Sequence, residues 1–255
     1  MKSFALFLDI DRTLTGNDHV IPQRNIDAIR CARALGHKVF INTGRSYGNI
    51  PPEIFSQIEV DGILSGNGTM ITIDGKTVFE RFMPAETASR LVRYYFENKH
   101  LWAAFEGRLR SYSIPGRPRE LTSLETPVTD FDDYLAKTKY DDIQVIAASA
   151  ETDSDFLDSF GGELTYFAFD RYYDIVAAGN NKSISMEKTL EITGIPRENS
   201  IAFGDSENDL DMLRKAGIGV AVANAQAELL KEADFVSLSN TDGGVGYAIE
   251  KLILK

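Results

Sequence analysis

The stretch ALFLDIDRTLT, residues 5–15, joins an apolar run to two carboxylates that stand one residue apart. The apolar run, Phe4 to Ile10, is typical of a strand that is buried on both faces of a parallel sheet. A buried carboxylate is costly unless a cation or a hydrogen-bond donor accompanies it. Asp9 and Asp11 therefore predict that other parts of the chain gather at the end of this strand.

The segments that follow alternate between helix and strand. A helical pattern opens at Pro22 and ends at Gly36, and residues 38–42 (KVFIN) have the pattern of a second buried strand. A strand, a helix and a strand within about 40 residues form a βαβ unit, whose strands are parallel. Residues 61–65 (DGILS) predict another strand, and the alternating residues around Asp74-Gly75 predict a hairpin.

The two remaining parts of the chain differ from each other. The last third again alternates, with expected strands at 200–204, 218–223 and 234–238 and expected helices at 183–193, 208–216 and 225–232 before a C-terminal helix. The middle predicts a helix at 86–99, another at 154–160, and short paired strands at 101–106, 108–114, 142–150, 164–170 and 172–178. Paired short strands indicate an antiparallel sheet with helices on one face.

The predicted architecture is therefore α/β. Residues 1–83 and 182–255 are expected to form a Rossmann-like core with a parallel sheet, into which an α+β domain of residues 84–181 is inserted.

Composition excludes several classes of protein. The 255 residues carry a formal net charge of -11 and a pI near 4.8, which argues against non-specific binding to nucleic acid or to an anionic membrane. The single cysteine, Cys31, forms no intrachain disulfide and fits a reducing compartment. The N-terminal apolar stretch is too short and too charged for a secretory signal or a membrane span, so we expect a soluble cytoplasmic protein, a monomer or a weak homodimer.

Ligands bind at the carboxyl ends of the strands of an open parallel sheet. Small and polar residues follow four of the expected strands: Asp9 and Asp11; Thr43, Gly44 and Arg45; Gly66, Asn67 and Gly68; and Gly204, Asp205, Asn208 and Asp209. The alternation of an extended chain puts Asp9 and Asp11 on the same side, unless the chain bends there. Asp205 adds a third hard oxygen donor in a chain with only three histidines, which suits Mg²⁺ better than zinc.

Four motifs in order carry a resemblance to a known family. They are DIDRT (residues 9–13), TGR (43–45), Lys182 and GDSENDLDM (204–212). Together they resemble the motifs of the haloacid dehalogenase-like (HAD) superfamily, and the inserted domain with SGNG (65–68) and AVANA (221–225) is similar to its Cof-type subfamily with a type IIB cap. The resemblance implies a HAD-like fold and a sugar-phosphate or related phosphatase, whose inserted domain is a lid that sets substrate specificity.

The resemblance also implies roles for residues. Asp9 would be the nucleophile that forms an aspartyl-phosphate, and Asp11 would protonate the leaving oxygen and then activate water. Mg²⁺ would bind the carboxylates of Asp9 and Asp205 and the backbone carbonyl of Asp11.

The remaining implied roles concern the phosphoryl group. Thr43 and the Gly44 amide would bind its oxygens, Lys182 would neutralise its charge, and Asn208 would contact it. Asp209 would orient Lys182 or a metal-bound water.

Some readings stay open at this point. Arg45 suits substrate contact and a structural salt bridge equally, and Asn67 either lines the site or belongs to a plain turn. Two residues depart from the family pattern: Arg12 stands where a glycine is usual, and Ser183 follows Lys182 where a glycine is common. Two alternatives follow for Arg12: it alters the loop's conformation, or it points toward the inserted domain and shapes the choice of substrate.

The expected function is a Mg²⁺-dependent phosphatase that hydrolyses small phosphate monoesters, either sugar phosphates or phosphorylated cofactors. Its partner is thus a small phosphorylated metabolite. The alternatives are a sugar phosphomutase, which would return the phosphoryl group to sugar, and a non-catalytic regulatory protein that binds a phosphate ligand. The motifs describe the phosphoryl half of the site and leave the leaving group unspecified.

Overall fold

The computed structural model describes residues 3–16, 19–115, 125–138 and 142–254. The chain divides into two compact units. The first comprises Met1–Thr43, Pro51–Phe79 and Asn181–Lys255, and the second comprises Gly44–Ile50 and Glu80–Asn180. The short segment Gly44–Ile50 thus belongs to the second unit, although it is flanked on both sides by the first.

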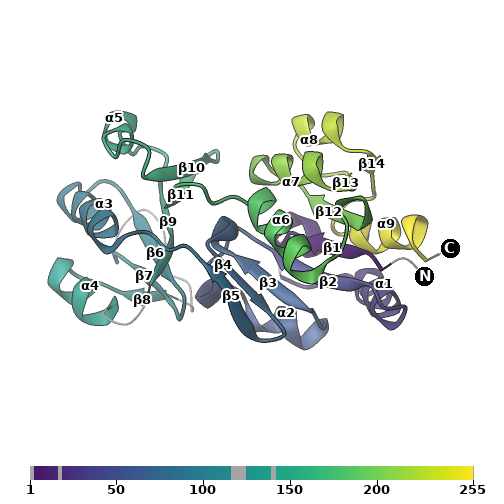
Figure 1. Ribbon diagram of the computed structural model, residues 1–255. Coiled ribbons are helices and arrows are strands. Elements are labelled where there is room, and N and C mark those ends of the chain that lie inside the picture. Colours follow the sequence, from purple (N-terminus) through teal and green to yellow (C-terminus); the bar gives the residue numbers. More distant parts are fainter. Residues whose placement is uncertain (1–2, 17–18, 116–124, 139–141, 255) are drawn as a thin grey trace. The chain divides into compact units, whose positions relative to one another are not determined.

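Parallel strands form most of the sheet in the first unit (Figure 1). Among the described residues its order is β14 (Phe235–Val236), β13 (Ile218–Ala221), β12 (Ser200–Gly204), β1 (Ala5–Leu8), β2 (Lys38–Asn42), β3 (Gly62–Ser65), β4 (Met70–Ile73) and β5 (Lys76–Glu80). Neighbours from β14 to β3 are parallel, and β4 is antiparallel to β3. The predicted α/β fold with a parallel core is confirmed.

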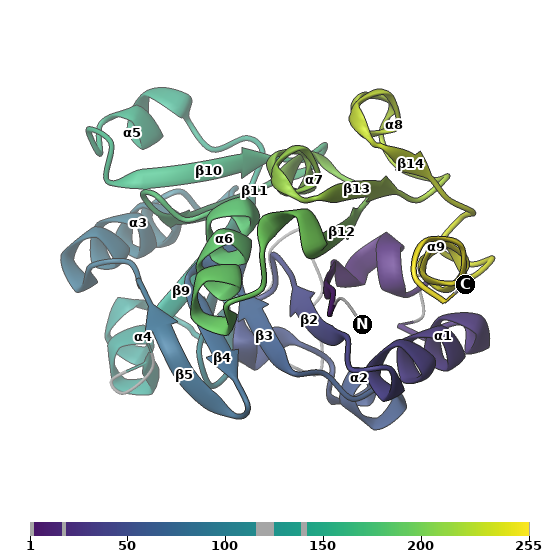
Figure 2. The same cartoon turned by 45° about the vertical axis from the view of Figure 1, so that its right-hand side comes forward.

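Helices cover both faces of this sheet. They are α1 (Gln23–Ala34), α2 (Pro52–Gln57), α6 (Lys182–Thr193), α7 (Leu210–Lys215), α8 (Ala227–Glu232) and α9 (Gly244–Leu252). Figure 2 shows α6, α7 and α8 along one side of the sheet and α1, α2 and α9 along the other. Phe7 and Phe40 stack at 5.2 Å in the same buried cluster as Met186 and Met212. Each such side chain contributes about 1.5–3 kcal/mol by leaving water.

The second unit has its own sheet and its own core. Among the described residues its order is β10 (Leu164–Ala168), β11 (Tyr172–Ala177), β9 (Ile143–Ser149), β6 (Ala103–Gly107), β7 (Ser111–Ser113) and β8 (Glu125–Pro127). These neighbours are antiparallel, apart from β7 and β8, which are parallel.

In the described part of this unit, three helices supply the rest of the core: α3 (Ala85–Glu97), α4 (Phe131–Thr138) and α5 (Ser154–Asp158). Tyr95 of α3, Tyr134 of α4 and Leu157 of α5 pack in one cluster with Phe105 and Ile146 of the sheet. Because Phe105 and Ile146 are cross-strand partners on one face, the helices cover that face. The predicted sheet with helices on one face is present, whereas β8, α4 and the parallel pairing of β8 were not predicted.

The segment Gly44–Ile50 is tied to the second unit by backbone hydrogen bonds. The Ser46 N–H donates to the Glu106 carboxylate at 3.2 Å, and the Tyr47 N–H donates to Gln144 Oε1 at 2.6 Å. A Cβ at Gly48 would collide with the backbone of Arg110, so this close approach requires glycine. Burial raises the pKa of the Glu106 carboxyl group, although the hydrogen bond from Ser46 opposes the rise.

No helix among the described residues is both long enough and apolar enough to cross a membrane.

Candidate active site

Asp9 lies directly beyond β1, where the chain leaves the sheet. Its N–H donates to the Phe203 carbonyl at 3.2 Å, and the next five residues, Ile10–Leu14, form a tight turn. Arg12 occupies the left-handed region within that turn, with φ of 61°. The predicted strand to Ile10 is therefore too long, because the chain bends immediately after Asp9.

This bend separates the environments of the two aspartates. Asp9 is buried, whereas the side chain of Asp11 is 43% exposed. Asp11 Oδ1 lies 3.9 Å from His19 Nδ1, a neighbour that the sequence did not indicate. The chain bends here, which is the exception that the alternation argument allowed, so strand alternation does not decide how Asp11 lies relative to Asp9.

Lys182 is brought to Asp9 by the start of α6. Asn181 caps this helix, because its Oδ1 accepts the N–H of Ile184 at 2.8 Å. Lys182 is 1% exposed, and its Nζ donates to Asp9 Oδ1 and to Asp209 Oδ1, each at 2.7 Å. One buried ammonium thus bridges two carboxylates from two different parts of the chain.

Asp209 is held in turn by the loop after β12. Its Oδ2 accepts the N–H groups of Asp205 at 3.1 Å and Ser206 at 3.2 Å. A Cβ at Gly204 would collide with Cβ and Cγ of Asp209, so only glycine lets the carboxylate fold back against the strand. Both oxygens of Asp209 therefore have partners, as expected of a residue that orients Lys182.

Asp205 completes a group of three carboxylates. It is 2% exposed, and it accepts a hydrogen bond from Thr13 Oγ1 at 3.3 Å. Ligand oxygens of Asp9, Asp205 and Asp209 lie within 4.8 Å of one another in the described part of the chain. These buried oxygen donors, with their excess negative charge, could hold a metal ion.

Burial and the neighbouring carboxylates raise the pKa values of Asp9 and Asp205. Burial raises the pKa of Asp9 well above its usual value, because the lowering by Lys182 is outweighed by burial together with Asp209 and Asp205. Burial and Asp209 raise the pKa of Asp205 to about 6, against opposing effects of Lys182 and Arg12. Burial alone would lower the pKa of Lys182, but Asp209 and Asp9 raise it, so the ammonium stays charged.

A hydrogen bond between two side-chain amides joins a second set of predicted residues. Asn208 Nδ2 donates to Asn67 Oδ1 at 3.0 Å, and the Asn67 N–H donates to the Thr43 carbonyl at 3.1 Å. All three residues are buried, and Asn67 adopts a left-handed φ of 52°. Asn67 is therefore both a turn residue and a neighbour of predicted site residues. The signal available in the sequence was an asparagine between two glycines at a strand end.

Gly44 and Arg45 fall in the second unit, apart from Thr43 of the same motif. Arg45 Nη1 donates to the Asn49 carbonyl at 3.1 Å within that unit. Of the predicted residues, Asp9, Lys182, Asp205 and Asp209 thus form one linked group, and Thr43 joins Asn208 through Asn67. The catalytic roles assigned to all of these residues stay predictions.

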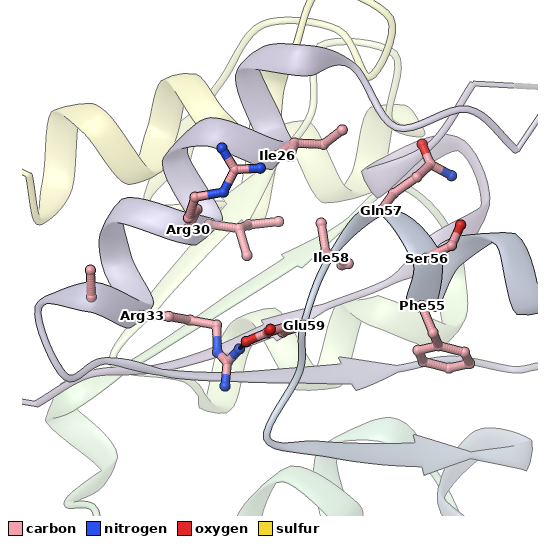
Figure 3. A pocket seen from close by; sticks show the side chains of 10 residues that line it. Ile26, Arg30, Arg33, Phe55, Ser56, Gln57, Ile58 and Glu59 are labelled. Atoms are coloured by element: carbon pink, nitrogen blue, oxygen red, sulfur yellow. Dashed lines mark hydrogen bonds and ion pairs between the residues drawn. The ribbon is translucent and has the colours of Figure 1, made fainter.

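A hollow elsewhere in the first unit carries none of these residues. It has a volume of about 660 Å³ and is lined by α1 and by the segment around α2 (Figure 3). Arg33 and Glu59 form an ion pair of 2.6 Å at its edge. No member of the carboxylate group is among its lining residues.

Comparison with known proteins gives one family. Residues 6–249 match the family described as haloacid dehalogenase-like hydrolase. A putative phosphatase, YkrA of Bacillus subtilis, is 27% identical over 99% of this chain and 98% of its own. The 5-amino-6-(5-phospho-D-ribitylamino)uracil phosphatase YitU of the same organism is 26% identical, with 96% of this chain and 95% of its own covered.

Solved structures give the same result. The fold matches that of BT4131, a sugar phosphatase of HAD subclass IIB, with a TM-score of 0.82 and 25% identity over 98% of both chains. With the match over residues 6–249, this establishes the family. The chain belongs to the haloacid dehalogenase-like hydrolases, and within them it is a phosphoric monoester hydrolase.

Proposed function

We propose that this hydrolase is a Mg²⁺-dependent phosphatase that cleaves small phosphate monoesters through a covalent aspartyl-phosphate on Asp9. The observation that carries the proposal is the contact of Lys182 Nζ with Asp9 and Asp209 at 2.7 Å. An ammonium there offsets one negative charge beside Asp9, which a nucleophilic carboxylate requires in order to approach a phosphate dianion.

The residues present fit a divalent cation that prefers oxygen. We assign the carboxylates of Asp9 and Asp205 and the backbone carbonyl of Asp11 as its ligands. Asp209 is the positioning residue instead, because both of its oxygens already accept hydrogen bonds. When bound, Mg²⁺ supplies positive charge that allows the anionic nucleophile and the phosphate to approach each other.

The first half-reaction forms the covalent bond. An oxygen of Asp9 attacks phosphorus, and the bond from phosphorus to the leaving oxygen breaks. Asp11 donates its proton to that oxygen, so the product leaves as a neutral alcohol. The side chain of Asp11 is 43% exposed, which allows it to exchange protons with solvent.

The second half-reaction restores the enzyme. The ionised Asp11 takes a proton from a water molecule, whose oxygen attacks phosphorus. The bond from Asp9 to phosphorus then breaks, and inorganic phosphate leaves. In both steps Thr43, the Gly44 amide and Asn208 bind phosphoryl oxygens, and Lys182 compensates the charge that develops on them.

The substrate class proposed here is that of sugar phosphates and phosphorylated cofactors. YitU is named for a ribityl phosphate and BT4131 is named a sugar phosphatase, so both have a polyhydroxylated leaving group. We assign recognition of the leaving group to the inserted domain, residues 84–181, acting as a lid. Arg45 is assigned to the substrate side of the site.

The test is phosphate release from a panel of sugar phosphates and phosphorylated cofactors, with Mg²⁺ and with EDTA. Asp9→Asn should abolish turnover, whereas Asp27→Asn, on the exposed surface of α1, should leave it unchanged. Borohydride reduction of quenched enzyme should convert the acyl-phosphate of Asp9 to homoserine, detected by peptide mass spectrometry. Full activity in EDTA would remove the metal assignment, and isomerised sugar phosphate without free phosphate would indicate a mutase.

A further inference from the structure

Arg12 is one of the two residues at which this chain departs from the family pattern, and its backbone conformation is unusual for arginine. Its φ of 61° and ψ of 6° lie in the left-handed region, where glycine is favoured and arginine is not. A residue with a Cβ at such a position requires support from its surroundings.

Two asparagines supply that support. Asn224 Nδ2 donates to the Arg12 carbonyl at 2.8 Å, and Asn224 Oδ1 accepts the N–H of Asn240 at 2.8 Å. Asn240 is buried, and its Nδ2 donates to the Thr15 carbonyl at 2.8 Å. The loop is thus held at the Arg12 carbonyl and again at the Thr15 carbonyl, three residues further along the chain.

The side chain of Arg12 lies beside a carboxylate that Lys182 does not contact. Its Nε is 3.7 Å from Asp205 Oδ2, while Lys182 forms ion pairs with Asp9 and Asp209. Among the described residues, Arg12 is the one positively charged side chain that lies within ion-pair distance of Asp205. The side chain of Arg12 is 58% exposed, so it has room to move away from Asp205.

We propose that Arg12 is a built-in counter-ion for Asp205 that competes with the divalent cation for this carboxylate. The proposal rests on the proposed function, in which Asp205 is a Mg²⁺ ligand. A positive charge at 3.7 Å stabilises Asp205 when no metal is bound and repels a cation that arrives there. Arg12 therefore lowers the affinity for Mg²⁺ below that of a chain with glycine at this position.

The experiment measures Mg²⁺ affinity, and not activity, by calorimetric titration and by the Mg²⁺-induced rise in Tm. It compares the natural chain with R12Q, R12K and R12G. R12Q removes the charge and keeps the Cβ, R12K keeps the charge, and R12G removes both. R214Q is the control, because it removes an arginine whose ion pair with Glu232 at 3.1 Å is also exposed.

R12Q and R12G should bind Mg²⁺ about two- to five-fold more tightly than the natural chain, as expected for one partly exposed charge. R12K and R214Q should resemble the natural chain. The difference between R12Q and the natural chain should shrink when the salt concentration is raised about tenfold, because exposed charges are screened.

Two results would overturn the inference. If R12Q binds Mg²⁺ as the natural chain does or more weakly, Arg12 does not compete with the cation. If only R12G differs, the backbone and not the charge is responsible. Failure of the proposed function looks different, since then neither the natural chain nor any variant shows a Mg²⁺ titration or a Tm shift.

Discussion

Lys182 and Arg12, which both lie beside the carboxylate group, differ in burial and in contacts. Lys182 is 1% exposed and contacts two carboxylates at 2.7 Å, whereas Arg12 is 58% exposed and lies 3.7 Å from one. Removal of a buried ammonium leaves its carboxylate partners buried and unpaired, which is costly. An exposed guanidinium is solvated whether or not it pairs with a carboxylate. Burial thus makes Lys182 part of the framework of the site, whereas Arg12 lies at its exposed edge.

The largest expected effect follows from removing the buried cation. Lys182→Met should lower the free energy of unfolding by about 3–5 kcal/mol, because Asp9 and Asp209 lose their shared partner. Turnover should fall by about 10² or more, since the charge beside the nucleophile is lost. Urea unfolding and phosphate release measure the two effects. Lys215→Met, which breaks an exposed ion pair with Glu187, is the control and should cost under about 1 kcal/mol.

The second largest effect is expected when Asp209 is displaced but no charge is removed. Gly204→Ala places a methyl group where Asp209 packs, and overpacking of this kind costs about 1–3 kcal/mol. Turnover should fall as well, because Asp209 moves away from Lys182. Gly36→Ala strains a left-handed turn residue that has open space around it, and it should lose stability while keeping full turnover. Equal turnover in both variants would contradict a positioning role for Asp209.

A smaller effect is expected from pH. In metal-free protein the pKa values of Asp9 and Asp205 lie above those of the unfolded chain, so the folded state holds these protons more tightly. This contribution is fully present below about pH 4 and is lost as the pH rises through about 6, the pKa of Asp205. The Tm should therefore be a few degrees higher at about pH 5 than at about pH 7.5.

Two comparisons isolate this contribution. Carboxylates with a lowered pKa, such as Asp61 and Glu250, titrate below this pH range and therefore do not change the Tm within it. Asp205→Asn should flatten the profile, and Mg²⁺ should raise the Tm most at the higher pH. Burial lowers the pKa of His37, which makes the Tm rise with pH over the same range, so the test is the difference between the natural chain and Asp205→Asn. Equal pH profiles of the two proteins would contradict the raised pKa of Asp205.

The smallest expected effect belongs to the exposed cation. Arg12→Gly loses an exposed ion pair but also relieves a left-handed backbone, and each change is worth about 1 kcal/mol or less. The net change in unfolding free energy should thus stay within about 1 kcal/mol in either direction. Thermal and urea unfolding measure it. A loss as large as that of Lys182→Met would erase the contrast between the two cations.

Residue patterns predicted the parts of this molecule that depend on local order. Buried apolar runs identified β1, β2 and β12, and the rule for parallel strand ends brought Asp9 and Asp205 to one edge. No local sequence pattern predicted the contact of Lys182 with Asp9, because the two residues are 173 positions apart. Only the resemblance to the family indicated Lys182.

Other features could not be predicted from local sequence patterns. The bend after Asp9 depends on a left-handed arginine, and arginine does not favour that conformation. The contact between Asn67 and Asn208 joins residues 141 positions apart. Strand β8 is only three residues long, in a polar stretch that predicted no element. In each case tertiary contacts decide a structure that local propensity leaves open.

The hydrogen bonds that tie Gly44–Ile50 to the second unit bear on the construction of chimaeras. The second unit consists of two separate pieces of chain, and the TGR motif is divided between Thr43 and Gly44. A graft of residues 80–180 alone from a relative would leave the Ser46 and Tyr47 amides facing foreign side chains. An exchange meant to transfer substrate preference must therefore carry residues 44–50 along with the larger insert.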